Sequence, residues 1–224
     1  MAFYIIFLLV VLILPIWASI NVKTTFSKYS SVHNSRGLTA DQVARQILDS
    51  NGLYDVGVEH ISGNLSDHYD PRAKVVRLSD SVYGKTSVSA IGVAAHECGH
   101  ACQHAEEYTP IKIRTAIVPV VNICSYLWYV VFLIGLAVFE SFPELAMIGV
   151  IMFSAVVLFQ LVTLPVELDA SGRALRTLEN DMILDSAEIP KARKVLKAAA
   201  MTYVVALVTA ILQLIRLLMI VKRD

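Results

Sequence analysis

Residues 87–100 read Ser-Val-Ser-Ala-Ile-Gly-Val-Ala-Ala-His-Glu-Cys-Gly-His, an apolar run that leads into two histidines. The apolar part is far too short to cross a bilayer, which needs about 20 residues. Such a run is typical of a buried core helix, and residues four apart on a helix lie on one face. The sequence therefore predicts a core helix that presents His96 and His100 side by side.

The segment from His96 to His100 has the form His-Glu-X-X-His. Two imidazoles one helical turn apart can bind one Zn²⁺, and the glutamate beside the first histidine can then accept a proton from a water molecule. We therefore expect one zinc ion, with His96 and His100 as ligands and Glu97 as the catalytic base. The alternative is a helix whose histidines are ordinary surface residues.

A catalytic zinc usually takes a third protein ligand, which this helix cannot supply. His104 lies about 12 Å beyond His96 along the helix, so it is an outer contact, a substrate contact or simply exposed. Glu167 is the better candidate, because it stands where an apolar segment ends and a polar helix begins. The alternative is a carboxylate that only stabilises the start of a helix. Asp169 could orient a ligand histidine, or it could only pair with Arg173.

Four further side chains are weaker candidates. His68, near a turn, could contact the substrate or its oxyanion, and Tyr83 could do the same. Cys98 and Cys102 are also four residues apart and could mimic a metal pair, but the histidines explain a metal better. The chain has 3 cysteines, an odd set that does not suggest a disulfide framework and fits a reducing compartment or the membrane interior.

Four long segments are strongly apolar. They span residues 3–20, 116–139, 145–166 and 198–221, each about the length that a bilayer requires. Hydrophobic residues make up 56% of the chain, above the roughly 45–50% of soluble domains. We expect a mainly α membrane protein, built as a single unit of about four transmembrane helices plus a small α+β zincin-like catalytic subdomain. The fourth segment could instead be a surface or re-entrant helix.

The catalytic region is expected to comprise residues 22–114 and 167–197. Basic residues are concentrated in these stretches, whereas the loop 140–144 carries two glutamates and no Lys or Arg. Because basic loops tend to stay in the cytoplasm, we expect both stretches there and the loop outside. Lys222 and Arg223 then fall outside, which counts against this orientation. Two crossings separate His100 from Glu167, so both should emerge on the same side of the membrane.

Short elements are expected between the first two apolar segments. Thr39 and Gln42 have capping-box spacing, which predicts an amphipathic helix over residues 40–50. Apolar residues around positions 56–60 and 75–79 predict strands of a small mixed sheet with two or three strands. We expect residues 75–79 to form an edge strand that could hold an extended substrate.

Four stretches of the chain match a known family. They are His68-Tyr-Asp-Pro71, Val75-Val-Arg-Leu-Ser79, Val93-Ala-Ala-His-Glu-Cys-Gly-His-Ala101 and Pro165-Val-Glu-Leu-Asp-Ala-Ser171. With this combination the sequence resembles the YugP-like membrane zinc metallopeptidases over nearly its whole length. The resemblance implies a prokaryotic, multi-pass protein of the cell membrane. It also implies a gluzincin-type site, with His96, His100 and Glu167 as ligands and Glu97 as the base.

A more distant similarity links the chain to HtpX-type and CaaX-prenyl membrane proteases. Those proteins carry an acid four residues after their ligand glutamate, where this chain has Ser171. Asp169 is the candidate to take the place of that acid.

We therefore expect a membrane-anchored, zinc-dependent endopeptidase that hydrolyses peptide bonds of membrane or membrane-proximal proteins. Its partners would be the lipid bilayer and a peptide or membrane-protein substrate, and a net charge of zero suggests no nucleic acid. One alternative is a non-catalytic, zinc-stabilised membrane scaffold or chaperone, which would not need Glu97. Another is an intramembrane protease, against which the polar sequence from Gln103 to Glu107 argues.

Overall fold

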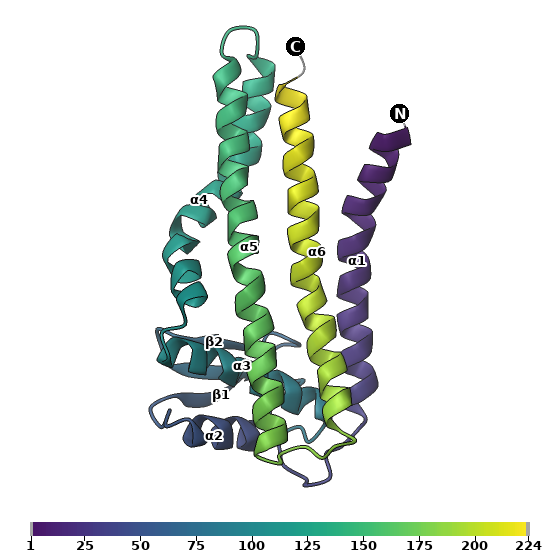
Figure 1. Ribbon diagram of the computed structural model, residues 1–224, viewed down its shortest axis with the longest axis vertical. Helices are drawn as coiled ribbons and strands as arrows, with labels where there is room; N and C mark the ends of the chain where they lie inside the picture. The colour runs from purple at the N-terminus through teal and green to yellow at the C-terminus, as the bar shows by residue number, and fades with distance from the viewer. Residues whose placement is uncertain (1, 223–224) are drawn as a thin grey trace. The chain divides into compact units, whose positions relative to one another are not determined.

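The computed structural model describes residues 2–222, with the backbone alone described for residues 2–6 and 8. In chain order, the elements are α1 (Ala2–Ser30), α2 (Ala40–Ser50), β1 (Gly57–Ile61), β2 (His68–Asp70), β3 (Val75–Ser79), α3 (Val88–Ala105), α4 (Thr109–Ala137), α5 (Pro143–Asn180) and α6 (Ile189–Val221) (Figure 1). The chain divides into two compact units. The apolar unit comprises Met1–Trp17, Pro110–Pro165 and Thr202–Asp224, and the site unit comprises Ala18–Thr109 and Val166–Met201.

Helices α1, α4, α5 and α6 are each long and apolar enough to cross a membrane. Large side chains on α4, such as those of Val120, Ile123 and Leu127, are exposed, as expected for a helix that faces lipid. Each of the four apolar segments recognised in the sequence lies in one of these helices, except that the segment 116–139 extends two residues beyond the end of α4. Helix α6 is continuous over 33 residues, or about 50 Å, which is too long for a re-entrant helix. The chain is therefore a mainly α-helical membrane protein.

Within the apolar unit, α4 and α5 form a hairpin joined by residues 138–142. Two glycines let the helix backbones approach closely. A Cβ atom on Gly149 would lie 2.8 Å from Cα of Phe132, and one on Gly135 would collide with the backbone of Ala146. Small residues at such crossings are typical of packed membrane helices, so this hairpin is specified by its glycines.

In the site unit, β3 is the central strand of a three-stranded mixed sheet. It runs parallel to β1 and antiparallel to β2, in the order β1-β3-β2. This confirms the expected small mixed sheet, but the expectation that residues 75–79 form an edge strand is wrong. Four of the five residues of β3 are buried, the pattern of a strand covered on both faces. Because both edges of β3 are paired, no substrate can add to it.

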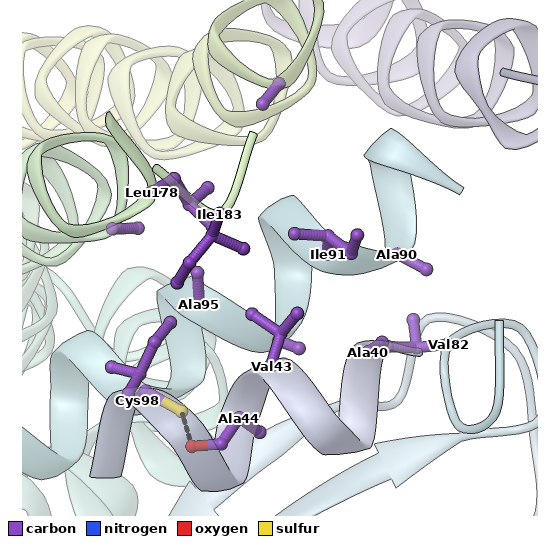
Figure 2. Close-up of a cluster of buried hydrophobic side chains, with 14 of the residues drawn as sticks. Ala40, Val43, Ala44, Val82, Ala90, Ile91, Ala95, Cys98, Leu178 and Ile183 are labelled. Carbon is purple, nitrogen blue, oxygen red and sulfur yellow. Dashed lines mark hydrogen bonds between the residues drawn. The ribbon is translucent and has the colours of Figure 1, made fainter. Parts of the chain in front are cut away.

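Helix α2 starts as predicted. The backbone N–H of Thr39 donates to Oε1 of Gln42 at 3.0 Å, and the helix runs over the expected residues. Its apolar face packs against α3. Figure 2 shows buried side chains of α2 and α3 together with Leu178 of α5 and Ile183, which follows α5. This core holds α3 against both the small sheet and the end of α5.

Candidate metal centre

Helix α3 carries both histidines of the sequence motif. Ser87 caps its start, because Oγ of Ser87 accepts a hydrogen bond from the backbone N–H of Ala90 at 3.3 Å. The first two turns are almost entirely buried, which confirms the expected core helix. The rings of His96 and His100 lie 4.7 Å apart between centroids and are nearly perpendicular, at 82°. The helix thus presents the two imidazoles side by side.

Helix α5 brings Glu167 to these two histidines. Its Oε2 lies 3.3 Å from Nε2 of His96 and 3.5 Å from Nε2 of His100. The ligand atoms of the three residues all lie within 4.8 Å of one another. Glu167 is only 2% exposed. The three residues proposed as ligands from the sequence are therefore neighbours in the fold, although 71 positions separate the first from the last.

Gly99 allows α5 to come this close. A Cβ atom at Gly99 would lie 2.7 Å from the carbonyl oxygen of Ala170 and 3.2 Å from its Cα. The distance between two packed helices depends on the side chains at their contact. Gly99 lies between the two histidines in sequence, and Ala170 lies about one turn after Glu167. This contact therefore sets how near the carboxylate comes to the imidazoles.

The donor set and its spacing fit Zn²⁺. Two imidazole nitrogens and one carboxylate oxygen are typical ligands of a catalytic zinc, with a fourth position left for water. Ligand atoms about 2.0–2.1 Å from one tetrahedral ion lie roughly 3.3–3.4 Å apart. The two measured distances from Glu167 to the imidazoles are 3.3 Å and 3.5 Å. His96, His100 and Glu167 are thus arranged as zinc ligands would be.

Gln103 fixes the proton on His100. The side-chain Nε2 of Gln103 donates to the carbonyl of Val166 and to Oδ2 of Asp169, both at 2.8 Å. Its Oε1 therefore faces Nδ1 of His100, 3.0 Å away, and accepts a hydrogen bond from it. With the proton on Nδ1, the lone pair of Nε2 is directed toward Glu167 and is available to a metal.

Asp169 acts on His100 through Gln103 and contacts no ligand histidine directly. The same carboxylate oxygen accepts a second hydrogen bond from Nε of Arg173 at 2.6 Å, and Arg173 donates to Glu106 at 2.7 Å. Asp169 therefore has the i+4 partner that the sequence suggested, and it also supports a ligand indirectly. Gln103 was not recognised in the sequence, although its position three residues after His100 on one helix is a signal that could have identified it.

Ser171 supports the other histidine. Its Oγ lies 3.1 Å from Nδ1 of His96, so it can accept the proton of this nitrogen and leave Nε2 for a metal. Ser171 is the residue that stands where the distantly similar proteases carry an acid. The structure therefore shows that the serine itself contacts the histidine and that Asp169 does not take this place.

Negative charge surrounds the cluster. Burial lowers the pKa of His100, but the hydrogen bond to Glu167 and the charges of Glu97 and Glu167 raise it above its ordinary value. Burial raises the pKa of Asp67, and the charge of Glu97 adds to that rise, while hydrogen bonds from Ser79 offset part of it. Asp67 was missed in the sequence. The buried carboxylates of Glu97 on α3 and Glu167 on α5, with the half-buried carboxylate of Asp67 beside the sheet, thus favour a cation at this place.

His68 is not brought to the cluster. It lies on β2, is exposed, and its Nδ1 contacts the carbonyl oxygen of Ser66 at 2.9 Å. The next residue, Tyr69, faces α3, because its ring lies 5.6 Å from the ring of His104. Successive side chains of a strand point to opposite faces, so His68 points away from α3. This alternation was invisible in the sequence, because the strand is only three residues long.

Two further candidates also lie elsewhere. The ring of Tyr83 packs 5.1 Å from that of His60. Sγ of Cys98 is turned into the core and donates to the carbonyl of Ala44 at 3.5 Å (Figure 2). Burial raises the pKa of this thiol well above its ordinary value, so it stays protonated and is a poor metal ligand.

Comparison with known proteins identifies the family of the chain. A family model described as "Putative neutral zinc metallopeptidase" matches residues 4–222. A protein of Bacillus subtilis (strain 168) named "Putative membrane protease YugP" is 48% identical over 207 residues, which are 92% of this chain and 91% of that protein. No solved structure matches the chain. The extent of both matches shows that the chain belongs to this family of membrane-bound neutral zinc metallopeptidases.

Proposed function

We propose that the protein is a membrane-anchored, zinc-dependent endopeptidase that hydrolyses peptide bonds of membrane or membrane-proximal proteins. The observation that carries the proposal is the cluster of His96, His100 and Glu167, with Glu97 on the same helix as the two histidines. Membership of a metallopeptidase family supports the reaction type, and the name of the Bacillus subtilis relative supports the membrane setting.

Each residue of the site has a distinct task in this proposal. His96, His100 and Glu167 hold one Zn²⁺, which when bound supplies Lewis acidity to a peptide carbonyl and to a water molecule. Glu97 accepts a proton from the water whose oxygen bonds to the carbonyl carbon. It then passes the proton to the amide nitrogen as the C–N bond breaks. Gln103 and Ser171 keep the imidazoles oriented during this cycle.

The proposed substrate-binding strand is β2. Unlike β3, β2 is an outer strand of the sheet and is paired on one side. It also contacts α3 through the rings of Tyr69 and His104. An extended peptide that adds to the open edge of β2 would then lie beside the helix that carries the histidines.

We propose that the chain crosses the cell membrane several times and that its site unit lies in the cytoplasm. The Lys and Arg residues of the stretches 22–114 and 167–197, set against a loop 140–144 that has no Lys or Arg, support this orientation. Single cysteines at Ser35, Ser141 and Ser186 in a cysteine-free variant would report it by labelling with an impermeant reagent. We expect labelling from outside at position 141 alone, and the opposite pattern would reverse the orientation.

The experiment that tests the activity is Glu97→Gln. We expect this variant to lose hydrolysis of a quenched peptide while it keeps zinc, measured by atomic absorption, because Glu97 moves a proton and is not a ligand. Glu144→Gln, in the first turn of α5, serves as the control and should change neither quantity. Full activity of Glu97→Gln would refute the proposal. Zinc-loaded, folded wild-type protein that cleaves no peptide would favour the scaffold alternative.

A further inference from the structure

One cavity in the site unit takes no part in the proposed reaction. It has a volume of about 1050 Å³ and lies between the end of α1 and the segment that leads into α3. Lys23 of α1 and Lys85 of that segment both line it, and none of the three zinc-ligand candidates does. A cavity of this size suits a small organic ligand or a lipid headgroup.

The lining of this cavity is basic. Of the residues that the structure places around it, two are lysines, one is His33, and none is Asp or Glu. The chain as a whole carries 19 basic and 19 acidic residues, so this is a local excess of positive charge. Asp80 lies outside the lining, and its carboxylate accepts hydrogen bonds from the backbone N–H of Gly63 and from His60, each at 2.8 Å. These two bonds, and to a smaller extent the charge of Lys85, lower the pKa of Asp80.

The start of α3 adds to the positive potential. Thr86 and Ser87 line the cavity, and α3 continues for 18 residues from this point. The N–H groups of Val88 and Ala90 already donate to Val32 and Ser87, so the start of α3 acts on an anion through the partial positive charge of its helix dipole. Oγ1 of Thr86 also contacts Nδ1 of His33 at 2.7 Å, which places this imidazole in the lining. Two ammonium groups, an imidazole and a helix start together favour a phosphate group.

The apolar surface of α1 ends just before Lys23, one of the residues that line the cavity. Exposed apolar side chains run along α1 and end with Ile16, Trp17 and Ile20. Lys23 follows less than one turn later, about 4.5 Å along the helix axis. Charged side chains just beyond an apolar span reach the headgroup level of a bilayer. Phe26, one turn further on, gives the cavity an apolar wall.

We propose that this cavity binds the phosphate-bearing headgroup of an anionic phospholipid. The phosphate lies between Lys23 and Lys85 near the start of α3, and the glycerol end of the lipid rests against Phe26 and Leu65. Free phosphate presents the same charge but no apolar part. The experiment therefore compares lipid and inorganic phosphate.

The test uses the full-length protein in micelles of a neutral detergent. Short-chain phosphatidylglycerol, short-chain phosphatidylcholine and inorganic phosphate are each titrated by calorimetry. The test variant is Lys23→Gln/Lys85→Gln. The control is Lys194→Gln/Lys197→Gln, which removes the same charge from exposed lysines of α6 in the same unit. We expect phosphatidylglycerol affinity to fall about tenfold or more in the test variant and less than about twofold in the control.

The remaining outcomes are decisive as well. Equal losses in both variants, or no loss in the test variant, would overturn the proposal, because binding would then not depend on this cavity. Equal affinity for phosphatidylcholine would overturn the requirement for an anionic lipid. If inorganic phosphate binds as tightly as phosphatidylglycerol, the ligand is free phosphate and the lipid assignment is overturned. Should the double variant fail to fold, Lys85→Gln alone gives the same comparison, since Lys85 is an exposed residue outside any helix or strand.

Discussion

The region around His100 and the region around His96 hold their imidazoles in different ways. Nδ1 of His100 donates to the fully buried Gln103, whose amide is itself bonded to Val166 and Asp169 of the neighbouring helix. Nδ1 of His96 faces the hydroxyl of Ser171, which can rotate. One ligand therefore has a fixed tautomer and orientation, whereas the other has a single adjustable partner. We therefore expect zinc affinity to fall more when the partner of His100 is removed than when the partner of His96 is removed.

Removal of Glu167, which lies close to both histidines, should lower zinc affinity the most. Glu167→Ala takes away the carboxylate that lies within 3.5 Å of each imidazole. We expect zinc affinity to fall by more than the roughly 10–100-fold loss that follows from changing an outer-shell residue, and hydrolysis to be lost with it. Chelator competition measures the first quantity. Exposed Glu179 on the same helix provides the control, as Glu179→Ala. Stoichiometric zinc in Glu167→Ala after dialysis against a mild chelator would mean that another residue is the third ligand.

A change that pushes α3 and α5 apart should cause the second-largest loss of zinc affinity. In Gly99→Ala the new methyl group meets the carbonyl of Ala170 at 2.7 Å, so α5 must move and carry Glu167 away from both histidines. We expect zinc affinity to fall about 100-fold while the protein stays folded, because the rest of the core is unchanged.

Gly92→Ala on the same helix is the matched control for this change. A Cβ atom there would meet its nearest neighbour, Cβ of Ala192, at an ordinary 3.8 Å. Zinc affinity should be unchanged and helix stability should rise slightly, since Ala is favoured over Gly in helices. Equal zinc affinity in both variants would show that the close approach of α3 and α5 does not set the site.

Loss of the His100 support should have a smaller effect than either change above. Gln103→Leu keeps the approximate size of the side chain but removes the acceptor for Nδ1 of His100 and the donor to Asp169. We expect zinc affinity to fall about 10–100-fold. Hydrolysis measured at saturating zinc should fall less than affinity, because the base Glu97 is untouched. Unchanged affinity in a folded variant would remove Gln103 from the site.

Loss of the His96 support should have the smallest effect. Ser171→Ala removes one neutral hydroxyl, and we expect zinc affinity to fall less than about tenfold. Ser171→Asp sharpens the comparison, because a carboxylate at this position accepts the Nδ1 proton more strongly and should raise affinity above that of the wild type. A larger loss in Ser171→Ala than in Gln103→Leu would invert the order of the two regions.

The sequence predicted those features that depend on local periodicity. The four-residue spacing of His96 and His100 indicated that both rings lie on one helix face. The two apolar segments between His100 and Glu167 indicated that these residues emerge on the same side of the membrane. Features that depend on contacts between distant segments were missed. Gln103 could not be recognised without knowing that Val166 and Asp169 approach it from α5. Residues 75–79 were expected at a sheet edge, because the three-residue strand β2 that covers them has no detectable pattern.

X-ray absorption at the zinc edge, on the full-length protein in detergent, tests directly whether His96, His100 and Glu167 bind a zinc ion. We expect one zinc per chain with nitrogen and oxygen neighbours only, at roughly 2.0–2.1 Å, and the scattering pattern of two imidazoles. The same measurement on His100→Ala should show one imidazole fewer. A sulfur neighbour at roughly 2.3 Å would point to a cysteine ligand and would contradict the assignment of His96, His100 and Glu167.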